Sequence, residues 1–289
     1  MLYVICGPTG SGKTSVSELL ANKLNAPIVN ADAYQIYKEM NIGTDKISNT
    51  DPIYARYHLL DIVSPEETFS VMQYQKLFRQ KIDELSKNYK DIIVCGGTGL
   101  YIRASLFDYE FKEQVADDVS DLESKTNEEL YELLKTIDPK SLDTIHINNK
   151  KRLIRAISIA RSGEQTKSEI IDSQEHKIIF DNVRILMLSP DRELLYNKIN
   201  KRVDEMFEKG LLDEVKYLLE KYELSVTARA AIGYKEIIDA LENNTSLEDA
   251  KGLIKKKTRN YAKRQVTYFK HQLPCEIYSS KEELLEAIK

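Results

Sequence analysis

The chain of 289 residues contains no tryptophan, three cysteines and four histidines. Because the cysteines have no paired spacing, they argue against a disulfide framework or a zinc site, and the histidines share no ligand spacing either. Cys6 and Cys95 end apolar runs and are expected to be buried thiols. No apolar run approaches the roughly 18 residues of a membrane helix, and no targeting segment is visible. We therefore expect a cytoplasmic protein, monomeric by default, with no membrane partner.

The chain also lacks an excess of positive charge, because its 42 Lys and Arg residues are outnumbered by 46 Asp and Glu residues. This balance argues mildly against a nucleic-acid partner, but binding depends on local charge. Residues 250–275 contain eight basic residues and no acidic one, and residues 150–161 contain five more. Helical spacing places Lys256, Arg259, Lys263 and Lys270 on one face. These clusters favour phosphate contact, with a solvated basic helix as the alternative, whereas the acidic stretch 108–143 should face away from RNA.

The hydrophobic pattern predicts an α/β fold. Apolar runs at residues 2–6, 26–30, 91–95 and 183–190 alternate with helical patterns at 15–24 and 75–86. Strands that are apolar on both faces indicate a parallel sheet covered on both sides. We expect a P-loop NTPase-like core from residues 1–108 and 181–289, helical from Asp191 onward. Residues 109–180 are expected to form a helical insertion domain.

A glycine-rich loop follows the first strand and matches the motif G-x-x-x-x-G-K-[ST] in full. Glycines let backbone N–H groups converge on an anion, and the next helix adds its N-terminal partial charge. In this pattern the lysine reaches the outer phosphate and the threonine hydroxyl can ligate Mg²⁺. The loop therefore predicts a di- or triphosphate site made of Gly7, Pro8, Thr9, Gly10, Ser11, Gly12, Lys13 and Thr14, with Mg²⁺ as cofactor on Thr14.

The presence or absence of an acidic residue after two of the strands bears on the reaction. A conventional NTPase has an acidic residue at the end of a later strand, but the strand at 91–95 ends in cysteine and glycines, which suggests a departing diphosphate. Asp32 follows the second strand at the carboxyl edge of the sheet, where ligands bind, and could accept a proton from a nucleophile. A helix cap or a solvated acid is an equal alternative. A small-molecule kinase would place an acid there as well.

The order and spacing of seven blocks resemble the tRNA dimethylallyltransferase family of bacterial type, over nearly the whole chain. The blocks are GPTGSGKT (7–14), NADAYQIYKEMNIGTDK (30–46), YHLLDI (57–62), CGGTGLYIRA (95–104), KKRLIRAISIARSGEQTKS (150–168), AIGYKE (231–236) and KTRNYAKRQVTYFKH (257–271). The resemblance implies transfer of a dimethylallyl group from dimethylallyl diphosphate to N6 of the adenosine 3′-adjacent to the anticodon, with release of diphosphate. The tRNA anticodon stem-loop would be the partner, and the insertion domain at residues 109–180 would contact it.

The resemblance also implies roles for individual residues. Asp32 would be the catalytic base, and Lys13, Thr14 and Arg229 would stabilise the leaving diphosphate. The implied tRNA contacts are Asp32, Ala33, Tyr34, Gln35, Thr98, Lys151, Arg152, Leu153, Ile154, Arg155, Lys263, Arg264 and Gln265.

The chain departs from the family at several positions. Ala33 replaces the usual serine, Tyr268 replaces a tryptophan, and residues 110–125 lack the usual proline and arginine pattern. The C-terminal zinc finger of the eukaryotic forms is absent. Three other interpretations remain: a P-loop small-molecule kinase, a prenyltransferase acting on free AMP or ADP, and, more distantly, a non-enzymatic RNA-binding module.

Overall fold

The computed structural model describes residues 1–109, 111, 119–163 and 165–288. They divide into two compact units, one of residues 1–106 and 179–289 and one of residues 107–178. The expected boundaries were 108/109 and 180/181. No described helix is long and apolar enough to cross a membrane.

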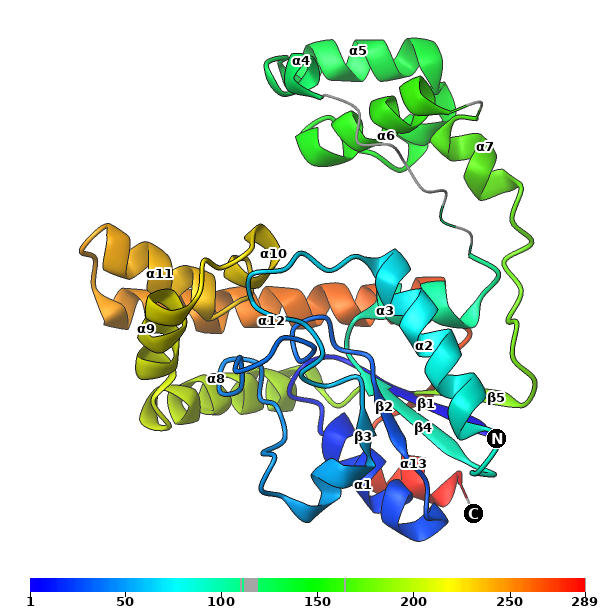
Figure 1. The fold of residues 1–289 in the computed structure, drawn as a ribbon, viewed down its shortest axis with the longest axis vertical. Coiled ribbons are helices and arrows are strands. Elements are labelled where there is room, and N and C mark those ends of the chain that lie inside the picture. The colour runs from blue at the N-terminus through cyan, green and yellow to red at the C-terminus, as the bar shows by residue number, and fades with distance from the viewer. Residues whose placement is uncertain (110, 112–118, 164, 289) are drawn as a thin grey trace. The chain divides into compact units, whose positions relative to one another are not determined.

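The larger unit contains six parallel strands in the order β3-β2-β4-β1-β5-β6 (Figure 1). The predicted α/β class is therefore confirmed. Two strands escaped prediction, and the second of them interrupts the C-terminal region expected to be helical. The strands are β1 (Leu2–Cys6), β2 (Ile28–Asn30), β3 (Tyr57–His58), β4 (Ile92–Gly96), β5 (Val183–Leu188) and β6 (Glu276–Tyr278).

Helices cover both faces of this sheet. The helices α1 (Lys13–Leu24) and α13 (Lys281–Glu286) pack on one face, whereas α2 (Val71–Leu85) and α3 (Gly99–Leu106) lie across the other (Figure 1). The side chains of β1 alternate between the two faces, so Ile5 packs with Val16 and Leu20 of α1. A strand buried on both faces is apolar throughout, which explains why the sequence revealed β1, β4 and β5.

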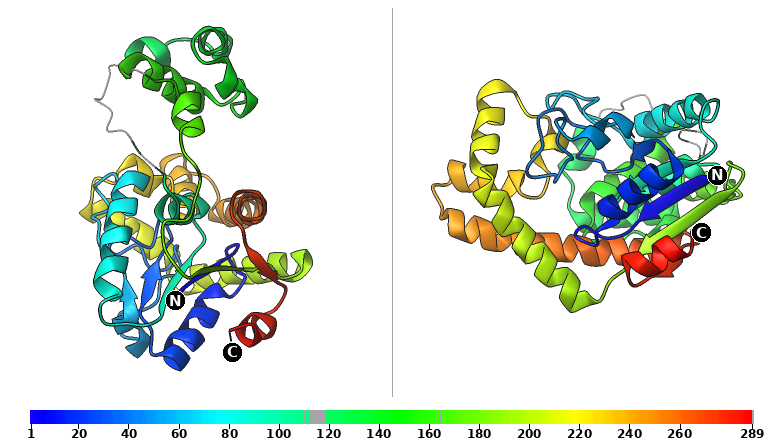
Figure 2. Two further views of the ribbon diagram at one scale, coloured as in Figure 1. Left: turned by 90° about the vertical axis from the view of Figure 1, so that its right-hand side faces the viewer. Right: turned by 90° about the horizontal axis from the view of Figure 1, so that it is seen from below.

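A second group of helices extends the unit beyond the carboxyl edge of the sheet. The long helix α12 packs against α8, α11 and α3, and the views in Figures 1 and 2 agree on its course beside α8. Tyr234, Ile237 and Ile254 belong to the core that these helices share. The helices are α8 (Arg192–Glu208), α9 (Leu211–Lys221), α10 (Val226–Arg229), α11 (Tyr234–Glu242) and α12 (Leu247–Gln272), and a 3₁₀ turn spans Pro52–Arg56.

The smaller unit is helical in its described part and has its own core. Leu130 and Leu134 pack against Leu153 and Ile157, and all four are buried. Its helices are α4 (Ser120–Glu123), α5 (Asn127–Ile137), α6 (Lys150–Ser162) and α7 (Lys167–Asp172), with a 3₁₀ turn at Pro139–Asp143. Half of the divergent segment at 110–125, namely residue 110 and residues 112–118, lies outside the described residues.

Candidate functional site

Three loops meet at the carboxyl edge of the parallel strands. The first is the glycine-rich loop of residues 7–14 between β1 and α1, called the phosphate loop after its expected ligand, in which Gly10 and Gly12 have φ values of 79° and 96°. A side chain at these positions would be strained, so glycine is needed for the turn. The first turn of α1 then presents free backbone N–H groups and a positive partial charge, which together attract an anion.

Lys13 and Thr14 begin α1. Lys13 Nζ lies 3.4 Å from the carbonyl oxygen of Pro8 in its own loop. Burial lowers the pKa of Lys13, which the carboxylate of Asp32 and the nearby Cys95 oppose, and the guanidinium of Arg202 lowers it further. A bound anion would reverse this effect, because it stabilises the ammonium form. The Thr14 side chain is exposed.

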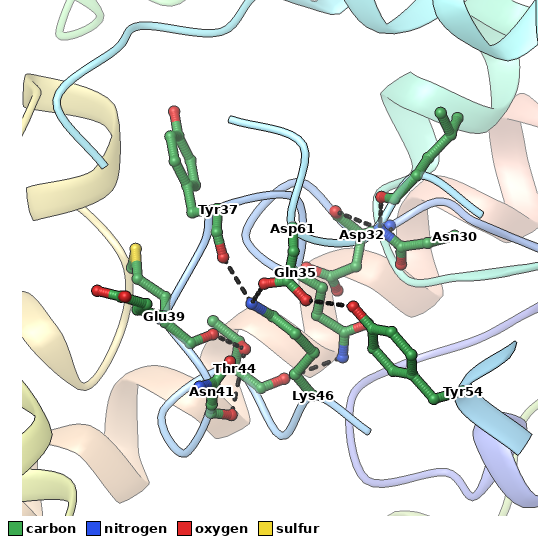
Figure 3. Close-up of polar contacts among 12 residues, drawn as sticks. Asn30, Asp32, Gln35, Tyr37, Glu39, Asn41, Thr44, Lys46, Tyr54 and Asp61 are labelled. Atoms are coloured by element: carbon green, nitrogen blue, oxygen red, sulfur yellow. Dashed lines mark hydrogen bonds and ion pairs between the residues drawn. The ribbon is translucent and has the colours of Figure 1, made fainter. Parts of the chain in front are cut away.

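Asp32 lies in the second loop, directly after β2, in a fixed position. Its backbone N–H donates to Asn30 Oδ1 at 3.1 Å, and Asn30 Nδ2 donates to the carbonyl oxygens of Asp32 and Leu59 (Figure 3). Asp32 Oδ1 accepts the N–H of Tyr34 at 3.0 Å. Asn30 is buried. The hydrogen bonds thus orient the carboxylate without a cationic partner among the described contacts.

The third loop, after β4, braces the second. Thr98 donates its backbone N–H to the carbonyl oxygen of Ala31, and its hydroxyl oxygen accepts the N–H of Ala33 at 3.0 Å. A Cβ on Gly96 would lie 2.1 Å from the carbonyl oxygen of Ala31, so only glycine permits this approach. Thr98 and Ala33 therefore lie beside Asp32.

A long loop from residue 33 to residue 46 forms one wall of the site and is held by buried polar groups. Lys46 Nζ donates to the carbonyl oxygen of Tyr37 at 2.5 Å and pairs with Asp61 at 2.6 Å (Figure 3). Tyr54 donates to the other oxygen of Asp61, and burial together with this carboxylate raises the pKa of Tyr54 to about 12. Gln35 donates to the carbonyl oxygen of Thr44.

The same loop is anchored at its tip by one carboxylate. Glu214 of α9 accepts the backbone N–H groups of Asn41, Ile42 and Gly43 and the hydroxyl of Tyr234 at 2.6 Å. These four donors occupy both oxygens of the carboxylate. The wall is therefore rigidly attached to the helical layer.

A cavity of about 240 Å³ lies where these loops face α8 and α12. Its polar groups are Thr9, Asp32, Arg202 and Arg264, with the phenol rings of Tyr34 and Tyr261. Burial, followed by the charge of Asp32, raises the pKa of Tyr261, so this phenol stays neutral. The remaining wall is mainly apolar and comprises Ile199, Val203, Met206, Ala230, Ala231, Ile232 and Ile254, together with Gly43, Thr44 and Thr258. Such a cavity can bind a small hydrocarbon beside an anion.

Arg202 is a functional candidate that sequence reasoning missed. Its guanidinium donates to Thr9 Oγ1 at 3.0 Å and lies 3.2 Å from Asp45 Oδ2. It brings a positive charge to the phosphate loop from a helix 193 residues away in sequence. Asn30, which precedes Asp32 at the end of a buried strand, was also missed.

The structure does not bring Arg229 to this site. Its guanidinium pairs with Glu242 of α11, and it lines a separate surface depression with Lys221 and Tyr222. The four-residue helix α10 places Ala230 and Ala231, rather than Arg229, against the cavity. The expected contact of Arg229 with a diphosphate therefore gains no support from this structure and stays a prediction, whereas Arg202 brings a positive charge to the glycine-rich loop.

Gln265 also differs from its expected role as a tRNA contact. Its side chain is 5% exposed, with Nε2 donating to the carbonyl oxygen of Gly97 at 2.7 Å and Oε1 accepting the N–H of Thr9 at 2.9 Å. Both amide atoms are thus used inside the protein. Gln265 connects α12 to the first and third loops, whereas its neighbours Lys263 and Arg264 are exposed.

Of the positive face predicted on α12, Lys256, Lys263 and Lys270 are exposed, whereas Arg259 is partly covered. Lys251 and Lys255 pair with Asp204, and Lys257 pairs with Glu236. Arg259 donates to Asn200 of α8. The exposed positions that remain are Lys256, Lys263, Arg264 and Lys270.

On α6 of the smaller unit, the predicted strip separates into two faces. Lys151, Arg152 and Arg155 are exposed, but Leu153 is fully buried in the core of that unit and Ile154 packs against the same core. Leu153 therefore has no surface for RNA, which corrects its expected role. Helical periodicity explains the split, because adjacent residues point 100° apart.

The cysteines are free thiols, as predicted, and Cys6 and Cys95 are buried. The fold nevertheless brings Cys6 and Cys275 together, with their sulfur atoms 3.9 Å apart. Among the described residues, no group of three or more His, Cys, Asp or Glu side chains could hold a metal ion.

Comparison with known proteins gives one consistent result. Two bacterial proteins named tRNA dimethylallyltransferase are similar to the chain. The one from Bacillus licheniformis is 42% identical over 94% of this chain and 88% of its own length. The one from Finegoldia magna is 44% identical over 92% of this chain and 87% of its own.

Solved structures agree. A tRNA delta(2)-isopentenylpyrophosphate transferase from Staphylococcus epidermidis superposes with a TM-score of 0.72, at 35% identity, covering 99% of this chain and 96% of that one. A eukaryotic dimethylallyltransferase acting on tRNA gives a TM-score of 0.82 at 27% identity, covering 98% and 77%. The model of the IPP transferase family matches residues 35–272. This match spans well over half of the chain, which therefore belongs to the IPP transferase family.

Proposed function

We propose that this chain is a tRNA dimethylallyltransferase that moves the dimethylallyl group of dimethylallyl diphosphate to N6 of the adenosine 3′-adjacent to the anticodon. The observation that carries the proposal is the cavity in which a phosphate-binding loop, a fixed carboxylate and an apolar wall meet. The names of the relatives, at 41–44% identity over most of the chain, support the same acceptor and donor class.

The diphosphate binds at the first turn of α1. Lys13 and the guanidinium of Arg202 neutralise the charge that grows on it as it leaves. Mg²⁺ would be held by the Thr14 hydroxyl together with phosphate oxygens and water, since this ion usually keeps several waters and binds through substrate phosphates. Mg²⁺ would supply further charge stabilisation at the diphosphate.

Asp32 acts on the acceptor. The lone pair of an adenine amine is delocalised into its ring, so the amine is a weak nucleophile. The Asp32 carboxylate, held by Asn30 and Tyr34, accepts the amine proton as the nitrogen forms a bond to the allylic carbon. The carbon–oxygen bond to the diphosphate breaks in the same displacement, and the leaving group takes the bonding electrons.

The target base must leave the anticodon stack to reach Asp32, at a cost of a few kcal/mol. The phenol rings of Tyr34 and Tyr261 line the cavity and offer surfaces for the extruded base. Exposed basic residues on α12 and on α6 would neutralise tRNA phosphates. They are Lys256, Lys263, Arg264 and Lys270 on the former, and Lys151, Arg152 and Arg155 on the latter.

The decisive experiment incubates the purified protein with unmodified tRNA, dimethylallyl diphosphate and Mg²⁺, followed by mass analysis of the nucleosides. We expect one prenylated adenosine per tRNA, and none when AMP replaces tRNA. The variant Asp32→Ala should bind tRNA normally and lose turnover. Transfer of the γ-phosphate from ATP to a small acceptor, without prenylation of tRNA, would refute the proposal.

A further inference from the structure

The apolar cavity shares a wall with a second hollow. The neighbouring hollow measures about 550 Å³ and is polar, with Lys46 and Asp61 among its lining residues. Two side chains of α8, Arg202 and Met206, line both spaces. Val203 lines the apolar cavity only.

The order of residues along α8 shows which end of the cavity lies at the phosphate loop and which end lies at Met206. Its residue Ile199 lies against the phosphate loop, because a Cβ built on Gly10 would be 3.0 Å from Ile199 Cγ1. Three residues later, on the same face of the helix, Arg202 donates a hydrogen bond to Thr9 of that loop. Met206 follows four residues further on, about 6 Å along the axis. The cavity therefore runs along α8 from an anion-binding end at the phosphate loop to an apolar end at Met206.

Met206 closes that far end firmly. Its side chain is 7% exposed and belongs to the buried cluster that includes Val203, Leu211 and Ile254. Beyond it lies the polar hollow, where Lys46 and Asp61 form their ion pair. A hydrocarbon longer than the cavity would have to displace packed atoms and then enter a polar space, and both steps oppose binding.

From this geometry we propose that Met206 sets the length of the prenyl chain that the enzyme accepts. The inference rests on the proposed function, since it assumes that the diphosphate binds at the phosphate loop. The five-carbon chain ends at Met206, and a ten-carbon geranyl chain collides with it. Truncating Met206 removes the packed atoms, which are the larger of the two barriers, and lets the second isoprene unit extend into the vacated volume beside the hollow.

The test is a competition between dimethylallyl and geranyl diphosphate for tRNA, with both products quantified by mass spectrometry. Because both donors share one reaction vessel, the product ratio reports the ratio of kcat/KM directly and does not depend on overall activity. We expect the wild type to use dimethylallyl diphosphate almost exclusively. The variant Met206→Ala should raise relative use of geranyl diphosphate at least tenfold, since even one methylene changes discrimination about 10–200-fold.

Val203→Ala is the matched control, because it enlarges the cavity without opening it to the hollow. It should shift the ratio much less than Met206→Ala, and Met206→Leu should resemble the wild type. If Met206→Ala does not fold, Met206→Val gives the same comparison, and calorimetric titration with each diphosphate replaces turnover where a variant is inactive.

Two results would overturn the inference: an unchanged ratio in Met206→Ala or Met206→Val, or an equal shift in Val203→Ala. Failure of the wild type to prenylate tRNA with dimethylallyl diphosphate would instead refute the proposed function. The two failures are thus distinguishable.

Discussion

The buried amide of Gln265 should stabilise the phosphate loop, and the substitution Gln265→Met tests this. Methionine keeps the length of the side chain but makes neither hydrogen bond. The carbonyl oxygen of Gly97, which is buried, and the N–H of Thr9, which is partly buried, would both lose their partners. An unsatisfied buried group costs about 1–3 kcal/mol, and the partly buried N–H of Thr9 should cost about 1 kcal/mol, so the two together should lower the free energy of unfolding by about 2–4 kcal/mol.

The loss should also reach the donor site. Thr9 lines the cavity and accepts a hydrogen bond from Arg202 through its hydroxyl, so a loosened Thr9 also misplaces that guanidinium. If about 1.4 kcal/mol of the lost energy falls on the conformation that binds diphosphate, KM for dimethylallyl diphosphate rises about tenfold. The value of kcat should change less, because Asp32 is held by separate bonds to Asn30 and Tyr34.

Urea unfolding followed by far-UV circular dichroism measures the first effect. The chain has two compact units, so the curve is fitted as two transitions, and only that of the larger unit should shift. The control is Gln272→Met on the same helix, because Gln272 is exposed and its amide oxygen accepts a hydrogen bond from Arg103 at the surface. Its effect should stay within about 0.5 kcal/mol. Equal midpoints and equal KM values for Gln265→Met and the control would refute the reasoning.

Three further predictions concern charge, packing and RNA contact. Burial lowers the pKa of Lys13 below its ordinary value of 10.5, and a diphosphate needs the ammonium form of this lysine. Affinity for dimethylallyl diphosphate should therefore fall as pH rises through the lowered pKa. Calorimetry across pH should show that Lys13→Met binds weakly at every pH and lacks this fall. Gly43→Ala should lower the free energy of unfolding, measured with urea, by about 1–3 kcal/mol, because the new Cβ would lie 2.4 Å from the ring of Tyr234; wild-type stability would contradict this. Arg152→Gln should reduce the salt dependence of tRNA binding by about one phosphate contact, whereas Leu153→Ala should destabilise the smaller unit by about 2–5 kcal/mol and leave the salt slope unchanged.

Local patterns account for what the sequence could predict. The strands β1, β4 and β5 are buried runs, and the phosphate loop is a contiguous motif whose glycines and lysine act within eight residues. The missed strands β3 and β6 contain two and three residues, none of them buried, so they lack the apolar signal by which a strand is recognised. Their pairing is decided by neighbours in the sheet rather than by their own composition.

The contacts that complete the site are long-range and therefore were not visible. Gln265 meets Thr9 across 256 residues of sequence, and a motif that marks the position as functional does not reveal whether its side chain faces RNA or the protein. Burial decides between these roles, and burial depends on the packing of α12 against the loops. The same holds for α6, where a single basic block contains both exposed residues and the buried Leu153.

Arg202 shows which signal the sequence did contain. Leu195, Ile199, Val203 and Met206 recur at helical spacing and predict one apolar face of α8, and Arg202 falls at the edge of this face. An arginine at the edge of an apolar face destabilises the fold unless its guanidinium finds a hydrogen-bond acceptor, since burying an unpaired charge opposes folding. Its presence in an otherwise apolar stripe therefore indicates a partner elsewhere in the chain, here Thr9 and Asp45. Arg229 does not lie at the edge of such an apolar face. It was predicted to contact the diphosphate because it lies next to the AIGYKE block, and its exposed ion pair with Glu242 does not support that role.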